Sequence, residues 1–101
     1  MIKHKKVYCT FFDYDYGDHI QCEVCKYNFD EKQDGVIYEA VDIHHISPRG
    51  MGHSGKCCNV NEIPNLVALC RNHHQMCEDD KSFNKKVRII HLKNIIKKLE
   101  E

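Results

Sequence analysis

Residues 41–52 read VDIHHISPRGMG, and this stretch places two adjacent histidines where an extended segment becomes a loop. Residues 36–46 are rich in β-branched side chains and predict a strand, whereas the proline and glycines of residues 47–56 predict a loop. Neighbouring side chains on a regular strand point to opposite faces, so His44 and His45 can do different work. One ring can bind a metal ion while the other stays free as a general base. Taken alone, such a pair is also compatible with a purely structural role.

Two pairs of potential metal ligands flank the histidine pair. Cys22 and Cys25 form a Cys-x-x-Cys knuckle before it, and Cys70 and His73 form a Cys-x-x-His knuckle after it. Four sulfur and nitrogen donors are the set that zinc takes in tetrahedral structural sites. The spacing therefore predicts a structural zinc ion held by these four side chains. The alternatives are buried apolar cysteines, or a redox pair of the thioredoxin type, whose βαβ surroundings the sequence lacks.

The remaining cysteines fit no knuckle. The chain has seven cysteines, and an odd count argues against a closed disulfide framework. We expect the four outside the knuckles to be neither metal ligands nor disulfide partners: Cys9, Cys57, Cys58 and Cys77. The adjacent pair Cys57–Cys58 is the one rival for a ligand position. In a reducing compartment, spaced cysteines and histidines indicate metal binding more often than disulfides.

The length and composition predict one small globular domain. The chain has 101 residues, of which 42% are apolar and 30% charged, and this composition excludes intrinsic disorder. We expect a single domain over residues 1–101, with a core at about 19–80 and a C-terminal helix at about 82–100. No apolar run approaches the ~20 residues of a membrane span. The basic N-terminus lacks the other features of a signal peptide, so we expect a cytoplasmic protein without membrane association.

The charge balance is neutral, with 15 basic and 15 acidic residues. A generic nucleic-acid-binding domain is usually basic, so this balance counts against one. The basic residues are nevertheless clustered, notably in residues 3–6, 85–88 and 93–98. A local basic face is therefore compatible with the sequence.

Hydrophobic spacing predicts two helices outside the histidine region. Residues 5–16 suit a short N-terminal helix, with a strand as the alternative. The C-terminal segment has apolar residues at steps of three, four and three, namely Ile89, Leu92, Ile96 and Leu99. This spacing predicts an amphipathic helix with a cap at Ser82 or Asn84 and a basic outer face. That helix either packs on the core or follows a DNA backbone.

Two further segments have local predictions. Residues 30–35, DEKQDG, predict a polar turn. Residues 59–79 begin as a loop and become a helix, or a short turn leading into one, from about Asn65 or Leu66. Asn65 is a suitable N-cap for that helix.

These motifs together resemble the HNH endonucleases, also called His-Me finger or ββα-metal nucleases. The resemblance rests on VDIHHISPRGMG, on CEVC at residues 22–25 and on NLVALCRNHHQ at residues 65–75, and it covers about residues 19–80. It is closest to the small phage and bacterial HNH proteins. The resemblance implies an α+β fold, with a zinc-stapled ββα-metal core, a short N-terminal helix and a C-terminal amphipathic helix.

The resemblance also implies a role for each matching residue. His44 corresponds to a ligand of the catalytic metal ion, and His45 corresponds to the general base. Asn65 corresponds to the residue that fixes the geometry of that base. His74 corresponds to the metal ligand from the helix, and Glu78, one turn further on, is a candidate additional or water-mediated ligand.

The sequence departs from the family pattern in places. His73 stands where relatives usually have a fourth zinc-binding cysteine, a change that Cys3His zinc sites tolerate. His73 and His74 are adjacent, and spacing assigns the first to zinc and the second to the catalytic ion. His53 stands where relatives often have glycine, and a solvent-facing loop residue is the expected interpretation. Arg49 is a candidate for holding a phosphate in nucleic-acid binding, or else a plain surface arginine.

The function implied by the resemblance is metal-dependent hydrolysis of DNA phosphodiester bonds. The implied cofactors are a structural zinc ion and a catalytic divalent ion, which is magnesium in the first instance and manganese or nickel otherwise. The expected partners are DNA and, in a larger nuclease complex, other proteins. The alternative is a non-catalytic, zinc-stapled module that binds nucleic acid or another protein, and the neutral net charge suits the protein-binding form.

Overall fold

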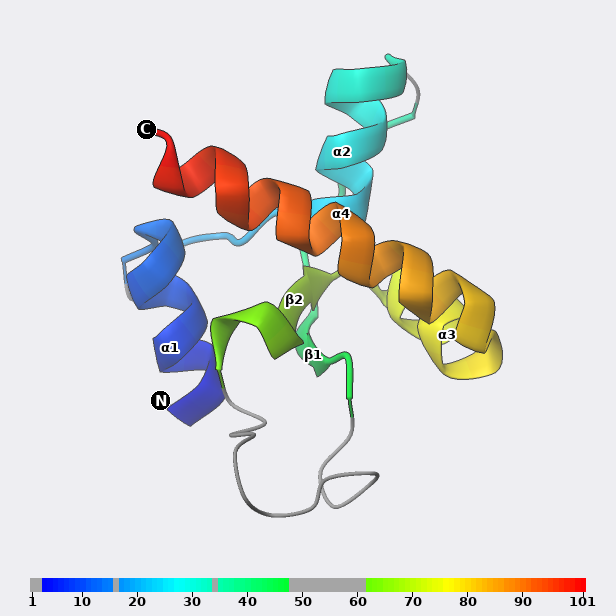
Figure 1. Cartoon of the computed structure of the whole chain (residues 1–101), viewed down its shortest axis with the longest axis horizontal. Coiled ribbons are helices and arrows are strands. Elements are labelled where there is room, and N and C mark those ends of the chain that lie inside the picture. The colour runs from blue at the N-terminus through cyan, green and yellow to red at the C-terminus, as the bar shows by residue number, and fades with distance from the viewer. Residues whose placement is uncertain (1–2, 16, 34, 48–61) are drawn as a thin grey trace.

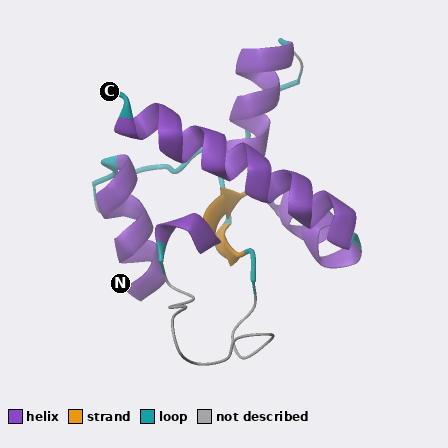
Figure 2. Ribbon diagram, viewed as in Figure 1, coloured by secondary structure: helices purple, strands orange, loops and turns teal. Residues whose placement is uncertain are grey.

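The computed structural model describes residues 3–15, 17–33, 35–47 and 62–101, in which helices surround a small sheet (Figures 1 and 2). In chain order the elements are α1 (Lys3–Phe12), α2 (Glu23–Lys32), β1 (Asp42–His45), the 3₁₀ helix η1 (Ile63–Asn65), β2 (Leu66–Leu69), α3 (Arg71–Asp79) and α4 (Lys81–Leu99). This mixture of helices and an antiparallel sheet is compatible with the expected α+β class. Four residues named above lie outside the described residues: Arg49, His53, Cys57 and Cys58.

The sheet has two antiparallel strands, and β2 separates two clusters of buried side chains. The register pairs Asp42 with Leu69, Ile43 with Ala68, His44 with Val67 and His45 with Leu66. Leu66 and Ala68 pack with α1, whereas Val67 and Leu69 pack with the knuckle cysteines and Val87 of α4. Because successive side chains of a strand point to opposite faces, both faces of β2 are buried.

The helix predicted from about Asn65 or Leu66 is wrong in this region. Leu66–Leu69 form β2, and α3 begins only at Arg71, after the first ligand of the second knuckle. All four side chains of β2 are buried, and a short apolar run of this kind has no periodicity to separate strand from helix. The strand predicted at residues 36–46 is also shorter, since only Asp42–His45 pair as β1.

The sequence-based predictions for the two N-terminal helices differ in how closely they match the structure. The helix predicted within residues 5–16 is observed as α1, and it buries Tyr8 and Cys9. The polar turn predicted at 30–35 is wrong in its first half, because α2 continues to Lys32. Only the first turn of α2 is buried, so its polar remainder carries no apolar spacing that would predict a helix.

The C-terminal helix α4 presents a different side to the core from the one that its apolar spacing predicts. Val87, His91 and Ile95 are its buried residues, and the expected apolar face is exposed. The helix is capped by Asp80, whose Oδ1 accepts a hydrogen bond from the Ser82 amide at 2.9 Å, rather than by Ser82 or Asn84. The C-terminal end of α4 lies beside the end of α1, where Lys98 pairs with Asp13 (Figure 1).

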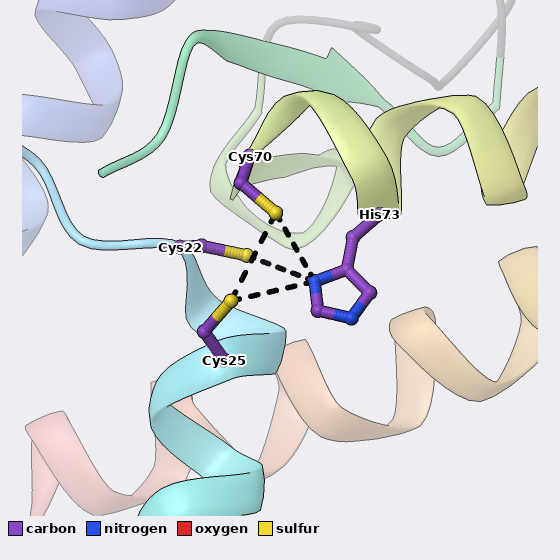
Figure 3. A group of neighbouring side chains, drawn as sticks. All are labelled: Cys22, Cys25, Cys70 and His73. Atoms are coloured by element: carbon purple, nitrogen blue, oxygen red, sulfur yellow. Dashed lines mark hydrogen bonds between the residues drawn. The ribbon is translucent and has the colours of Figure 1, made fainter. Parts of the chain in front are cut away.

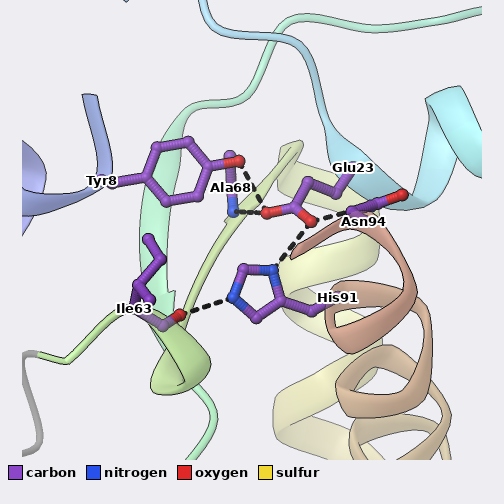
Figure 4. Close-up of polar contacts among 6 residues, drawn as sticks. All are labelled: Tyr8, Glu23, Ile63, Ala68, His91 and Asn94. Carbon is purple, nitrogen blue, oxygen red and sulfur yellow. Dashed lines mark hydrogen bonds and ion pairs between the residues drawn. The ribbon is translucent and has the colours of Figure 1, made fainter. Parts of the chain in front are cut away.

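A buried carboxylate at the start of α2 explains why α4 is turned in this way. Glu23 receives four hydrogen-bond contacts on its two oxygens (Figure 4). They come from Tyr8 Oη at 2.6 Å, the Ala68 amide at 3.3 Å, His91 Nδ1 at 2.8 Å and Asn94 Nδ2 at 2.8 Å. A buried charge is costly unless it is paired and hydrogen-bonded. The contacts of Glu23 therefore select the His91 side of α4 for the core.

Candidate metal centre and histidine groove

The two predicted knuckles meet in space and form a Cys3His cluster (Figure 3). Cys22 precedes α2 and Cys25 lies in its first turn, while Cys70 precedes α3 and His73 lies in its first turn. The sulfur atoms and one ring nitrogen all lie within 4.8 Å of one another. Each knuckle is thus made by a helix start, which turns two side chains separated by two residues toward one point.

Four of the distances within the cluster are close to the edges of a metal tetrahedron, and the widest separation in the cluster is up to 4.8 Å. His73 Nδ1 lies 3.4 Å from Cys22 Sγ, 3.5 Å from Cys25 Sγ and 3.3 Å from Cys70 Sγ, and the Cys25 and Cys70 sulfurs are 3.8 Å apart. Zinc bonds of about 2.3 Å to sulfur and about 2.0 Å to nitrogen give tetrahedral edges of about 3.8 Å between sulfurs and about 3.5 Å between sulfur and nitrogen. The cluster could therefore hold a structural metal such as zinc.

Burial makes a thiolate in the cluster depend on a neighbouring cation. Burial raises the pKa of the Cys22 thiol to about 12, although the backbone N–H groups of Cys25 and Cys70 act in the opposite direction. Burial also raises the pKa of Cys25. A thiolate in this position needs a positive charge beside it, and a divalent metal provides that charge. Burial lowers the pKa of His73, which keeps its ring neutral and able to coordinate.

The structure separates the two adjacent histidines of α3. His73 belongs to the Cys3His cluster and stacks on Phe83, with the ring centroids 5.9 Å apart. His74 instead contacts His44 of β1, with the ring centroids 5.0 Å apart. Cys9 and Cys77 are free, buried thiols that do not belong to the cluster. The geometry thus matches the ligand set that the spacing predicts.

A second site lies in a groove between β1, α3 and α4. The groove is lined by His44, His45 and His74, and by the start of α4. It therefore gathers the three histidines to which the resemblance assigns catalytic roles. The Cys3His cluster lies at the first turn of α3, so the same helix reaches both sites.

The ring of His44 is held by an amide of α4. Its Nε2 lies 3.1 Å from Asn84 Oδ1, and Asn84 Nδ2 donates to the Ile46 carbonyl at 2.9 Å. The second bond fixes which end of the amide faces His44, so Nε2 donates and a neutral ring keeps its lone pair on Nδ1. Burial is the main cause of the lowered pKa of His44 and favours this neutral form. A ring held in this way is prepared to coordinate a metal.

His45 and Asn65 lie at the end of β1. The ring of His45 is tilted against that of His4 from α1, with the centroids 4.8 Å apart. Asn65 binds both backbone groups of Ser47, accepting from its amide at 2.7 Å and donating to its carbonyl at 3.1 Å. Asn65 therefore fixes the chain just beyond His45. Nothing in the sequence pattern indicates the contact of His4.

Two carboxylates lie beside His74. Its Nε2 is 3.3 Å from Glu78 Oε1, one helical turn further along α3, and 3.9 Å from Asp42 Oδ2 of β1. The sequence prediction included Glu78 but missed Asp42. The signal was available, because Asp42 and His44 are two residues apart on a strand and share a face.

The wall of the groove formed by α4 is basic. Lys81, Lys85 and Arg88 all line it, at positions i, i+4 and i+7 of one helix. Arg88 Nη2 also donates to Ser47 Oγ at 2.8 Å, at the end of β1. Three cations on one wall make this groove locally positive, although the chain is neutral overall. The sequence shows the basic cluster at residues 85–88, but its position beside the histidines follows only from the fold.

The groove residues are less tightly gathered than the cysteine cluster. Within residues 3–15, 17–33, 35–47 and 62–101, Cys22, Cys25, Cys70 and His73 form the one group of three or more Cys, His, Asp or Glu ligand atoms that converge. His44 and His74 are therefore a pair rather than a complete coordination shell.

None of the helices in the described part of the chain has the length and apolar character needed to cross a bilayer.

Comparison with protein-family models, with curated proteins and with solved structures found no match to this chain.

Proposed function

We propose that the chain is a metal-dependent endonuclease of the HNH type that hydrolyses phosphodiester bonds of DNA, built on a ββα-metal core of β1, β2 and α3. The single observation that carries the proposal is that His44, His45 and His74 line one groove with a basic wall. The structural zinc ion belongs in the separate Cys3His cluster. An ion held by these four side chains would tie the start of α2 to the start of α3, the helix that bears His74.

Each histidine has a distinct task in the proposed reaction. His45 accepts a proton from the attacking water, whose oxygen then forms a bond to phosphorus as the bond to the 3′-oxygen breaks. The leaving 3′-oxygen takes a proton from solvent water, so the products are a 5′-phosphate and a 3′-hydroxyl. General bases of this kind contribute about 10²–10⁴ in rate. Asn65 keeps the end of β1 in place beneath His45 through its two bonds to Ser47.

His44 and His74 would hold the catalytic divalent ion, with Glu78 as a further or water-mediated ligand. Such an ion supplies Lewis-acid stabilisation of the charge that develops on the phosphate. The donor set suits the role, since two imidazoles and a nearby carboxylate would leave coordination positions for substrate and water. Magnesium is the first candidate, and manganese and nickel are the alternatives.

The basic wall would bind the DNA backbone. Lys81, Lys85 and Arg88 face the same groove as the histidines, and phosphate contacts supply most of the non-specific affinity for DNA. The arrangement explains how a chain with no net charge can still attract a polyanion at one place. Affinity should accordingly fall steeply with added salt.

A non-catalytic module is the second candidate. The histidine groove lacks a set of converging ligand atoms like that of the cysteine cluster, and a binding module needs only the structural metal. Such a module, holding nucleic acid or another protein, would use the basic wall or an apolar surface without any cleavage.

Plasmid cleavage separates the two candidates. Purified, zinc-loaded protein is incubated with supercoiled plasmid and magnesium, manganese or nickel, with an EDTA-quenched control. Conversion to nicked or linear plasmid in a metal-dependent way supports the nuclease. The absence of cleavage with every metal, together with binding in a gel-shift assay, supports the module instead.

A further inference from the structure

We propose that the chain self-associates through the solvent-facing side of α4, as a two-fold antiparallel dimer. This inference does not depend on the nuclease function. It rests on four apolar residues, here called the α4 stripe: Ile89, Leu92, Ile96 and Leu99. Their exposed fractions are 56%, 41%, 57% and 68%. Steps of three, four and three place them on one side of the helix.

The α4 stripe is separate from the side that packs on the core. The core side is formed by Val87, His91 and Ile95, which are buried. At about 100° per residue, Ile89 lies about 160° around the helix from His91. A surface helix normally has one apolar side, so a second one indicates a further contact.

The stripe has the residue types of a two-stranded helical pair. In heptad terms, isoleucine occupies both a positions and leucine both d positions, so the stripe has the apolar seam of a helical pair. A second copy of α4 presents the same stripe. A two-fold axis then brings each side chain opposite a complementary one, as in an isologous interface.

The charges beside the stripe favour the antiparallel direction. In the register that places Ile89 opposite Leu99 of the second copy, Lys86 lies across from Glu100 of that copy, and the pairing occurs twice. Lys93 would face its own symmetry mate, but its ammonium group is drawn toward α2, 5.6 Å from the centre of the Tyr27 ring. A parallel pair would instead set Arg88 beside Lys93 twice, which is repulsive.

The contact is small, because it involves one side of one helix per copy. Interfaces of this size are weak and transient, so we expect a dissociation constant in the micromolar range or weaker. The dimer should then be absent at nanomolar concentration and populated on the order of 100 μM to 1 mM.

Sedimentation velocity over that concentration range tests the proposal with zinc-loaded, full-length protein. Wild type should shift from monomer to dimer. Ile96→Glu should raise the dissociation constant about tenfold or more, since it places two carboxylates in the apolar contact. Lys97 is the next residue along α4 but lies outside the stripe, so Lys97→Glu should leave the dissociation constant unchanged. Both sites are exposed, and circular dichroism and zinc content confirm that each variant folds. A wild type that stays monomeric throughout, or two variants with equal effects, would overturn the proposal.

Exchanging the charges of Lys86 and Glu100 tests whether the two helices run antiparallel. Lys86→Glu should weaken the dimer, because it brings two acidic side chains together across the interface. Adding Glu100→Lys to it should restore the dissociation constant to near that of wild type, as expected for two residues in contact. If the double variant is no tighter than Lys86→Glu alone, the antiparallel register is wrong.

Discussion

Asn84 of α4 holds His44 of β1 through a 3.1 Å contact between its side-chain oxygen and Nε2, and its nitrogen donates to the Ile46 carbonyl two residues further on. One amide therefore fixes both the ring and the strand that carries it. The last helix of the chain thus determines the orientation of a residue that lies 40 positions earlier.

Replacing Asn84 should weaken binding of the catalytic ion without disturbing the zinc site. Asn84→Ala leaves His44 without the partner that fixes its tautomer, and losses of this kind cost about 10–100-fold in metal affinity. Manganese binding, followed by electron paramagnetic resonance, measures the effect. Asn72→Ala removes the same amide from an exposed position of α3 and serves as the control. Equal manganese affinity in wild type and Asn84→Ala would show that Asn84 does not orient a ligand.

His45 should be needed for cleavage but not for metal binding. His45→Ala should lower plasmid cleavage by about 10²-fold or more, the usual scale for a lost acid–base group, and should keep zinc content and manganese affinity. His44→Ala and His74→Ala should lose both cleavage and manganese affinity. If His45→Ala loses manganese as completely as His44→Ala does, His45 is a ligand and not the base.

The chain should contain one tightly bound zinc ion, held by Cys22, Cys25, Cys70 and His73. Cys22→Ser should lose the zinc and much of the fold, because zinc binding supplies folding energy in such small domains. The variant in which Cys9, Cys57, Cys58 and Cys77 are all serine should keep its zinc. Elemental analysis of the purified proteins decides the matter, and a folded wild type without zinc would contradict the prediction.

The metal-free protein should respond to alkali in the opposite sense from the zinc-loaded protein. Burial raises the pKa of Cys22 to about 12, so the folded state favours the neutral thiol. Its contribution to stability is present below the unfolded pKa of about 8.5 and is lost as the pH rises toward 12. With zinc bound, the thiolate form is required, and acid rather than alkali should release the metal. Urea unfolding at pH 7 and pH 10, with and without chelator, measures the difference.

The buried contact between His91 and Glu23 should contribute measurably to stability. Both side chains are buried, so His91→Ala leaves the Glu23 carboxylate without its 2.8 Å partner. Removing one hydrogen-bond partner of a buried polar group costs about 1–3 kcal/mol. His19→Ala is the control, because the ring of His19 pairs with Glu39 at the surface and its loss should leave the urea midpoint unchanged.

The sequence predicts the Cys3His cluster well because each knuckle is local. Two residues between ligands are enough to define a pair, and only the meeting of the two pairs requires the fold. The histidine groove is harder to predict, since its α4 wall depends on how that helix is turned. The spacing of Ile89 and Leu92 is the strongest apolar signal in α4, and it predicts the wrong buried side. The buried side is set by Glu23, a residue 68 positions away from His91.

The strand β2 is a second element whose conformation the local sequence does not predict. Leu66–Leu69 are all buried, yet four consecutive apolar residues carry neither a helical nor an alternating period. Their extended conformation follows from pairing with β1 and from cover on both faces. The position of Lys81 in the same groove as His74 likewise depends on contacts that no local pattern contains.

The location of Glu23 between the two cysteines of the first knuckle also limits the transfer of that knuckle to another protein. In a self-contained knuckle, the residues between the ligands face solvent and are freely exchangeable. Here Glu23 and Val24 are both buried, and Glu23 contacts three other segments of the chain. If residues 22–25 were grafted into another scaffold, the Glu23 carboxylate would lack the hydrogen-bond partners that it has here. A designer who wants this centre elsewhere has to move the surrounding network with it, or replace Glu23 first.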